Sequence, residues 1–231
     1  MPNHPSSERS SVRPRRTLTL PRLGPVARLA CLGLFVAADA SAATQVYYSV
    51  GQSTALDLRT GVPTCSVVGT TLTFNLPQTD TRFGVGAKVT YGGANVCYVS
   101  GKSSATVWSC VTAKGVTPPA AASGTAVNSI RHAFASLQAA RTGMSGASFL
   151  NGTDLVAGNY VVNLPCYYDT GPDTTPLVLD GYITGPTNYI RIYTPTDTAL
   201  ECNQSQRHDG KWNNTRFRMQ VPDYQTSISV G

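Results

Sequence analysis

The sequence predicts a mainly β fold with one helix, and three observations indicate it. The chain has 231 residues, of which only 13% are charged, and it contains 21 glycines and 11 tyrosines. In such a composition hydroxyl and aromatic residues favour strands, while Gly and Asn favour turns. Many short runs alternate between apolar and polar residues, as half-buried strands do, and one segment near the middle has apolar residues at helical spacing.

The first 42 residues have the pattern of a secretory signal peptide. Arginines precede the apolar run LACLGLFVAA, and the small residues Ala40, Ser41 and Ala42 follow it. This pattern predicts cleavage near Ala42 and a mature protein that is secreted, or held at a bacterial cell surface or in the periplasm. No later segment approaches the roughly 20 apolar residues of a spanning helix, so we expect no membrane span in the mature chain.

The charge of the chain is concentrated in this leader. The whole sequence carries a net charge of +6, but six of its 18 Lys and Arg and two of its 12 acids precede Ala43. The remainder has 12 basic and 10 acidic residues, a net of +2, with no basic run that could follow a phosphate backbone. We therefore exclude nucleic acid as a partner.

Residues 43–58 contain the first predicted strand, TQVYYSVG. Residues 59–116 then hold short alternating strands separated by Gly, Asn and Ser, among them TCSVVGTTLTFNL, AKVTYGG and ATVWSCVTA. These predict a small antiparallel module, a barrel or curled sheet, inserted after the first strand. Residues 117–127, which begin with TPPAAASG, are expected to be a linker.

Five of the six cysteines lie after the leader, so export permits disulfides but leaves at least one thiol over. We expect a disulfide between Cys65 and Cys110, because both lie in short strand-like runs of the inserted module. No CxxC pair occurs, and His132 and His208 are the only histidines after the leader. A zinc site is therefore not expected.

Residues 128–141 predict an amphipathic helix. Ile130, Phe134 and Leu137 recur at i, i+4 and i+7, which places them on one helical face. Asn128 or Ser129 is the expected N-cap, and Gly143 is the expected stop. His132 falls on the polar side of this helix, where we expect it to be exposed.

Residues 142–231 return to short strands with polar loops between them. In RFRMQV, for example, Phe217 and Met219 alternate with Arg216 and Arg218. Strands this short, without two-residue hairpin turns, favour a solenoid whose rungs stack in parallel. The open end of a solenoid core needs a cover with one apolar face, so residues 128–141 are predicted to be a capping helix.

Three stretches follow one another along the chain: VYYSVGQST, SIRHAFASLQAA and LVAGNYVVNLPCYYD. Together they resemble the opening of bacterial secreted right-handed parallel β-helix repeat proteins, the pectate-lyase-like superfamily. In that family an extended strand leads to a capping helix and then to a G-x-Y segment before the first rung. The matching residues here are Ser129, Ile130, Ala133, Gly158 and Tyr160. The resemblance implies a short right-handed parallel β-helix with an inserted antiparallel module.

The chain departs from that family after the predicted cap. Only a few rungs would follow, and the terminal TSISVG has no capping segment. We therefore expect a product truncated at Gly231, with the family's catalytic Arg and calcium-binding Asp residues beyond it. No family role is carried over, and this fold hosts enzymes and binding proteins alike.

Candidate binding residues are aromatic, because flat rings can stack on sugars. The predicted ligand-binding set is Tyr167, Tyr168, Tyr189, Tyr193 and Trp212. Asp169 and Asp173, in YYDTGPDTT, could bind Ca²⁺ through oxygen atoms or cap backbone amides of a turn; we favour the caps and expect no cofactor. Adjacent His208 and Asp209 are not expected to form a catalytic pair, and no activated Ser is recognisable, so no catalytic residue is assigned.

Three functions remain open. The favoured one is a noncatalytic secreted or cell-surface protein for adhesion, carbohydrate contact or spacing, whose partner is a polysaccharide or a cell-surface molecule. It is favoured because the sequence lacks a convergent set of acids, bases or metal ligands. The second is the N-terminal fragment of a polysaccharide lyase or hydrolase. The third is binding of a partner protein through the inserted module.

Overall fold

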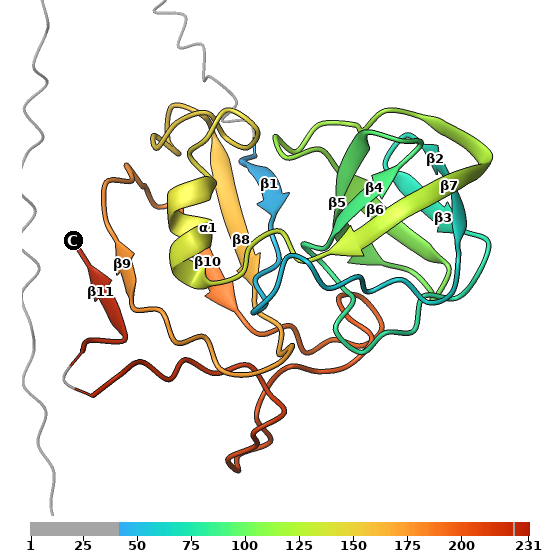
Figure 1. Ribbon diagram of the computed structural model, residues 1–231. Coiled ribbons are helices and arrows are strands. Elements are labelled where there is room, and N and C mark those ends of the chain that lie inside the picture. The colour runs from blue at the N-terminus through green and yellow to red at the C-terminus, as the bar shows by residue number, and fades with distance from the viewer. Residues whose placement is uncertain (1–41, 224) are drawn as a thin grey trace, which may run out of the picture. The chain divides into compact units, whose positions relative to one another are not determined.

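The computed structural model describes residues 42–223 and 225–231, so the predicted signal peptide lies outside the described residues except for Ala42. The described part contains eleven strands and one α-helix (Figure 1). In chain order these are β1 Thr44–Tyr47, β2 Thr64–Val68, β3 Thr71–Phe74, β4 Lys88–Tyr91, β5 Asn95–Lys102, β6 Val107–Val111, β7 Ala121–Arg131, α1 Leu137–Gly143, β8 Tyr160–Pro165, β9 Leu177–Leu179, β10 Ile190–Tyr193 and β11 Ile228–Val230.

Six strands form a closed antiparallel barrel in the order β2-β3-β6-β5-β4-β7. Its long last strand, β7, pairs with both β2 and β4 and so closes the barrel; each pairing contains an irregularity that lets the strand bend. Alternation along the strands sends every second side chain inward, as in β4, where Val89 and Tyr91 are buried. Trp108 and Phe83 pack at the centre with ring centroids 4.4 Å apart.

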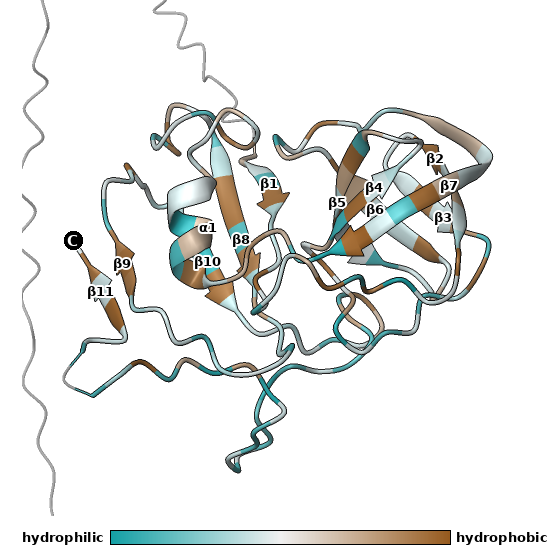
Figure 2. Ribbon diagram, in the orientation of Figure 1, coloured by the Kyte–Doolittle hydropathy of each residue, from teal (hydrophilic) through white to brown (hydrophobic). Residues whose placement is uncertain are grey.

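The remaining strands form two small parallel sheets. β8 lies between β1 and β10, and β9 pairs with β11. Because β8 is the central strand of its sheet, nearly all of its side chains are buried, and Figure 2 shows its hydrophobic stretch in brown. The helix α1 packs against β9. These elements share a second hydrophobic core, separate from that of the barrel.

The chain is mainly β, but the predicted right-handed parallel β-helix is wrong. The fold is a closed antiparallel barrel with two small parallel sheets. The error has a physical cause: a side-chain period of two is common to parallel and antiparallel strands, so alternation alone does not reveal how strands pair. The G-x-Y segment at Gly158 does lead into the central strand β8, although that strand belongs to a sheet of three.

The predicted capping helix at residues 128–141 is also wrong. Ile130 lies on β7 in the barrel core, whereas Phe134 and Leu137 lie in the second core, so the three do not share one helical face. Helix α1 begins only at Leu137, where the Ser136 hydroxyl accepts a hydrogen bond from the Ala139 amide at 3.0 Å. No helix in the described part is long and apolar enough to cross a membrane.

The predicted boundaries of the inserted module change with this correction. Residues 121–131 form β7, so much of the expected linker at 117–127 is barrel strand. The barrel therefore extends beyond the expected 59–116. The Gly, Ser and Thr residues of β7 are weak helix formers, and pairing with two neighbouring strands determines their conformation.

Candidate functional site

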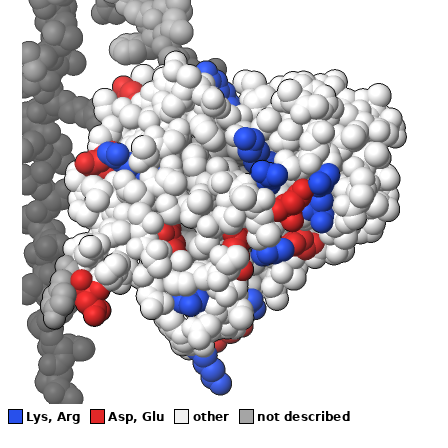
Figure 3. Space-filling model, in the orientation of Figure 1, with Lys and Arg blue, Asp and Glu red and all other residues white. Residues whose placement is uncertain are grey.

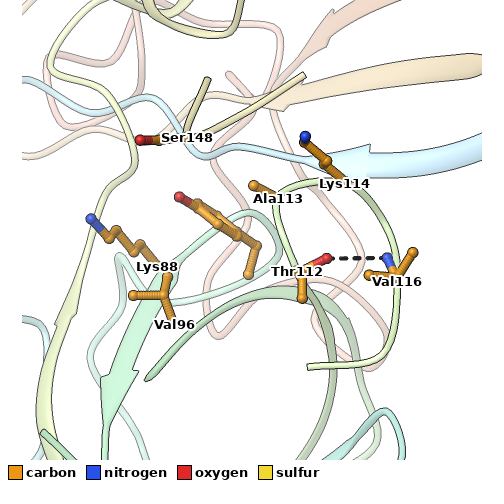
Figure 4. Close-up of a pocket in the computed structure, with 8 residues that line it drawn as sticks. Lys88, Val96, Thr112, Ala113, Lys114, Val116 and Ser148 are labelled. Carbon is orange, nitrogen blue, oxygen red and sulfur yellow. Dashed lines mark hydrogen bonds between the residues drawn. The ribbon is translucent and has the colours of Figure 1, made fainter. Parts of the chain in front are cut away.

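A pocket of about 440 Å³ opens beside the barrel (Figure 4), and we call it the barrel pocket. Its volume lies within the range of small-molecule sites. Most of its wall comes from β4, β5 and the turn after β6, and one residue comes from the segment after α1. The lining residues are Lys88, Val96, Tyr98, Thr112, Ala113, Lys114, Val116 and Ser148.

The barrel strands determine which side chains reach this pocket. On β5, Cys97 and Val99 point into the barrel core, so Tyr98 between them points outward. Three hydrogen bonds hold the turn after β6. The Thr112 amide donates to the Val116 carbonyl at 2.8 Å, the Gly115 amide donates to the Thr112 carbonyl at 3.0 Å, and the Val116 amide donates to the Thr112 hydroxyl at 3.2 Å. The wall of the pocket is therefore formed before any ligand binds.

Tyr98 is the most buried polar group in the lining. Its side chain is 4% exposed and packs edge-on against Tyr48, with ring centroids 5.4 Å apart. Within the described residues its hydroxyl forms no hydrogen bond. Burial, together with the neighbouring Cys97, raises the pKa of Tyr98 to about 12, so the phenol stays protonated at neutral pH and can donate to a ligand.

Two lysines lie on different sides of the barrel pocket, as Figure 4 shows. Neither Lys88 nor Lys114 belongs to the ion pairs found among the described residues, and no acidic side chain lines the pocket. Lys102 differs from them, because its ammonium donates to the carbonyls of Thr198 and Cys202. The pocket thus presents two ammonium groups with no protein partner in the described part of the chain.

A Ser, a His and an Asp also meet in the structure, at a second place. The Ser49 hydroxyl lies 3.1 Å from His132 Nδ1, and His132 Nε2 lies 2.9 Å from Asp169 Oδ1. The side chains of His132 and Asp169 are fully buried, and Ser49 is 0% exposed. The Ser49 hydroxyl also accepts a hydrogen bond from the Ala133 amide at 3.2 Å. A nucleophile must reach its substrate, so this Ser49–His132–Asp169 cluster is structural rather than catalytic.

The carboxylate of Asp169 joins this cluster to the chain after β1. Its Oδ2 accepts hydrogen bonds from the amides of Gln52 at 2.7 Å and Ser53 at 3.0 Å. Burial alone would raise the pKa of Asp169, but His132 and these two amides outweigh it and hold the pKa below its ordinary value. Position 51 requires glycine, because a Cβ there would lie only 2.3 Å from both the Asp169 carboxylate and the His132 imidazole.

The structure overturns the expectation for His132 and agrees with the expectation of backbone caps for the two aspartates. His132 was expected on an exposed helix face, but it is 1% exposed and stacks on Tyr167 with ring centroids 5.1 Å apart. Asp169 and Asp173 have backbone partners, since Asp173 accepts from the amides of Leu137 and Thr175. Within the described residues no group of three or more His, Cys, Asp or Glu could hold a metal ion.

The five predicted aromatic residues do not form one platform. Tyr167 is buried, and its hydroxyl donates to the Val85 carbonyl at 2.9 Å. Tyr168 and Tyr189 line two different pockets. The Arg191 guanidinium covers the ring of Tyr193 at 4.1 Å, and Trp212, which is 71% exposed, stacks on His208.

All five described cysteines are free and buried, so the predicted Cys65–Cys110 disulfide is not present in this structure. Both residues lie in the barrel core together with Cys97. Cys110 contacts Cys97: the hydrogen bond between their thiols, together with burial, raises the pKa of Cys97 well above its usual value. Burial likewise raises the pKa of Cys65 to about 11, which makes its thiolate scarce at neutral pH.

Fold and pocket together define a mainly β protein with a closed six-stranded antiparallel barrel and an open pocket whose two lysines have no acidic partner among the described residues. Figure 3 shows acidic and basic side chains interspersed across the visible face rather than gathered into one basic field. Comparison with protein-family models, with curated proteins and with solved structures found no match. The function must therefore be argued from the pocket residues themselves.

Proposed function

We propose that this chain is a noncatalytic secreted binding protein and that its barrel pocket binds the uronic acid units of an acidic polysaccharide. One observation carries the proposal. Lys88 and Lys114 have no acidic partner among the described residues, and they share a pocket with the Tyr98 hydroxyl, which forms no hydrogen bond there.

A uronic acid matches each part of this lining. Its carboxylate suits the two ammonium groups, which attract an anion as point charges and require no fixed geometry. The sugar hydroxyls can exchange hydrogen bonds with Thr112 and Ser148, while the apolar ring face can pack on Val96 and Val116. Neutral sugars would leave the lysines unpaired, so the lining favours acidic over neutral glycans.

The same lining supports binding rather than turnover. Glycoside hydrolysis generally requires two carboxyl groups beside the scissile bond. The barrel pocket is lined by neither Asp nor Glu, and by no His. Ser49, the only candidate nucleophile of the Ser49–His132–Asp169 cluster, is 0% exposed and lines none of the pockets found in the described part of the chain, although His132 and Asp169 each line one of them.

The proposal predicts a charge-dependent preference for acidic sugars. Isothermal titration calorimetry should detect binding of β-1,4-linked glucuronate oligosaccharides but not of cello-oligosaccharides of equal length, which carry a hydroxymethyl group in place of each carboxylate. The double substitution Lys88→Gln with Lys114→Gln should weaken binding about tenfold or more, since a hydrogen bond to a charged group contributes roughly 1.5–3 kcal/mol. Thermal stability should be retained, because neither lysine has an acidic partner to lose.

Lys211→Gln is the matched control, because this exposed lysine loses the same charge away from the barrel pocket. It should bind glucuronate oligosaccharides as the wild type does. Equal affinity for the neutral oligosaccharides, or full affinity in the double variant, would show that the lysines do not recognise a carboxylate.

A further inference from the structure

A second cavity of about 410 Å³ adjoins the barrel pocket, and we call it the central pocket. Two features connect the cavities. Lys88 lines both of them, and the consecutive residues Ser148 and Phe149 line one each. The two cavities are therefore neighbours that meet at Lys88.

The central pocket contains a third unpaired cation. Arg131 is exposed and belongs to none of the ion pairs among the described residues. It lies directly opposite Lys88, because β4 and β7 are antiparallel with Lys88 and Arg131 in register. Like charges opposite each other on neighbouring strands destabilise a sheet. A bound anion between them would remove this repulsion.

The rest of the central pocket suits a sugar ring. Thr90 and Ser129, the next outward-facing pair on the same two strands, supply hydroxyl groups. Phe134 and Phe149 supply aromatic surface, with ring centroids 4.8 Å apart. Aromatic surface beside hydroxyl groups is a suitable lining for the apolar face and the polar rim of a pyranose.

We infer that the two pockets are consecutive subsites for an acidic oligosaccharide with carboxylates on neighbouring sugars. One sugar lies in the barrel pocket near Lys114. The next places its carboxylate between Lys88 and Arg131 in the central pocket. This inference rests on the proposed function and narrows its ligand class from acidic polysaccharides in general to chains that carry carboxylates on neighbouring sugars.

The test compares methyl glucuronide with glucuronate dimers and tetramers of one linkage, by NMR titration. The wild type should bind the dimer at least tenfold more tightly than the monomer, with little further gain for the tetramer. Arg131→Gln should reduce dimer affinity to the monomer level and leave monomer affinity unchanged. Because it removes a like-charge contact, its melting temperature should equal or exceed that of the wild type.

Arg207→Gln, an exposed arginine away from both pockets, is the matched control and should keep the dimer preference. Equal affinity of the wild type for monomer and dimer, or an unchanged dimer preference in Arg131→Gln, would overturn the inference while leaving the barrel pocket as a single site. Absence of binding by any of the three glucuronates would instead overturn the proposed function itself.

Discussion

Asp169→Ala is expected to lower the free energy of unfolding by about 3–5 kcal/mol, because it leaves three donors without an acceptor and each buried unsatisfied donor costs roughly 1–3 kcal/mol. The carboxylate is fully buried and satisfies three groups at once: His132 Nε2 at 2.9 Å and the amides of Gln52 and Ser53. Alanine removes the acceptor of all three groups. Each unsatisfied buried donor adds to the loss.

Urea denaturation followed by circular dichroism measures this loss. Asp209→Ala is the control, because it removes the same charge from an exposed position in a loop and should change stability by less than about 0.5 kcal/mol. The stability loss of Asp169→Asn should lie between those of Asp169→Ala and Asp209→Ala, since the Asn amide oxygen can still accept hydrogen bonds from the backbone. If both alanine variants unfold at the same urea concentration, the Ser49–His132–Asp169 cluster does not hold the fold together.

The same carboxylate makes stability depend on acid pH. The folded-state pKa of Asp169 lies below the value of about 3.9 expected in the unfolded chain. The native state therefore binds protons less readily, and the stabilisation is fully present above about pH 4 and is lost as pH falls through the folded pKa. In urea titrations at decreasing pH, the difference between wild type and Asp169→Asn should shrink below about pH 4. If the stability difference between wild type and Asp169→Asn does not change with pH, the effect comes from packing and not from the charge of Asp169.

This cluster also shows what the sequence could not reveal. Strand content followed from alternation, since period two is a local property of the chain. The Ser49–His132–Asp169 cluster joins residues separated by 83 and 37 positions, which no local pattern relates. Asp169 does accept backbone amides, as a turn aspartate was expected to do, but the amides belong to a distant segment at Gln52 and Ser53.

The candidate site escaped sequence analysis for a similar reason. Lys88 and Arg131 are unremarkable in sequence, and only the register of β4 on β7 places them opposite each other. The sequence pointed to aromatic residues instead, but these contact other groups of the protein; the Arg191 guanidinium, for example, covers the ring of Tyr193. One signal was readable: Lys88 begins the alternating run KVTY, so it had to face outward once Val89 and Tyr91 faced the core.

Gly86→Ala is expected to destabilise the protein by about 2–5 kcal/mol. Gly86 has φ +82°, a conformation that costs an L-residue roughly 1–2 kcal/mol. A Cβ there would also lie 2.4 Å from the Ser49 amide nitrogen and 2.8 Å from Pro165 Cγ. Relief of such a clash requires backbone movement, which typically costs a further 1–3 kcal/mol.

The close approach of Gly86 to Ser49 allows backbone hydrogen bonds between two parts of the fold. The Gly86 carbonyl accepts a hydrogen bond from the Ser49 amide at 2.8 Å, and the Gly86 amide donates to Val99 on β5 at 2.7 Å. Gly86 thus connects the barrel to the chain that follows β1. A side chain at this position would push Ser49 away and disturb its contact with His132 as well.

Gly124→Ala separates the cost of the positive φ from the cost of the clash that a Cβ at position 86 would make. Gly124 has a similar φ of +87°, but a Cβ there would meet nothing within 4 Å. Its loss should be only the roughly 1–2 kcal/mol of backbone strain. The difference between the two variants, measured by urea denaturation, is then the cost of the clash between the added Cβ and its neighbours Ser49 and Pro165. If the two losses are equal, the barrel and the chain after β1 are not packed as closely as the 2.4 Å approach requires.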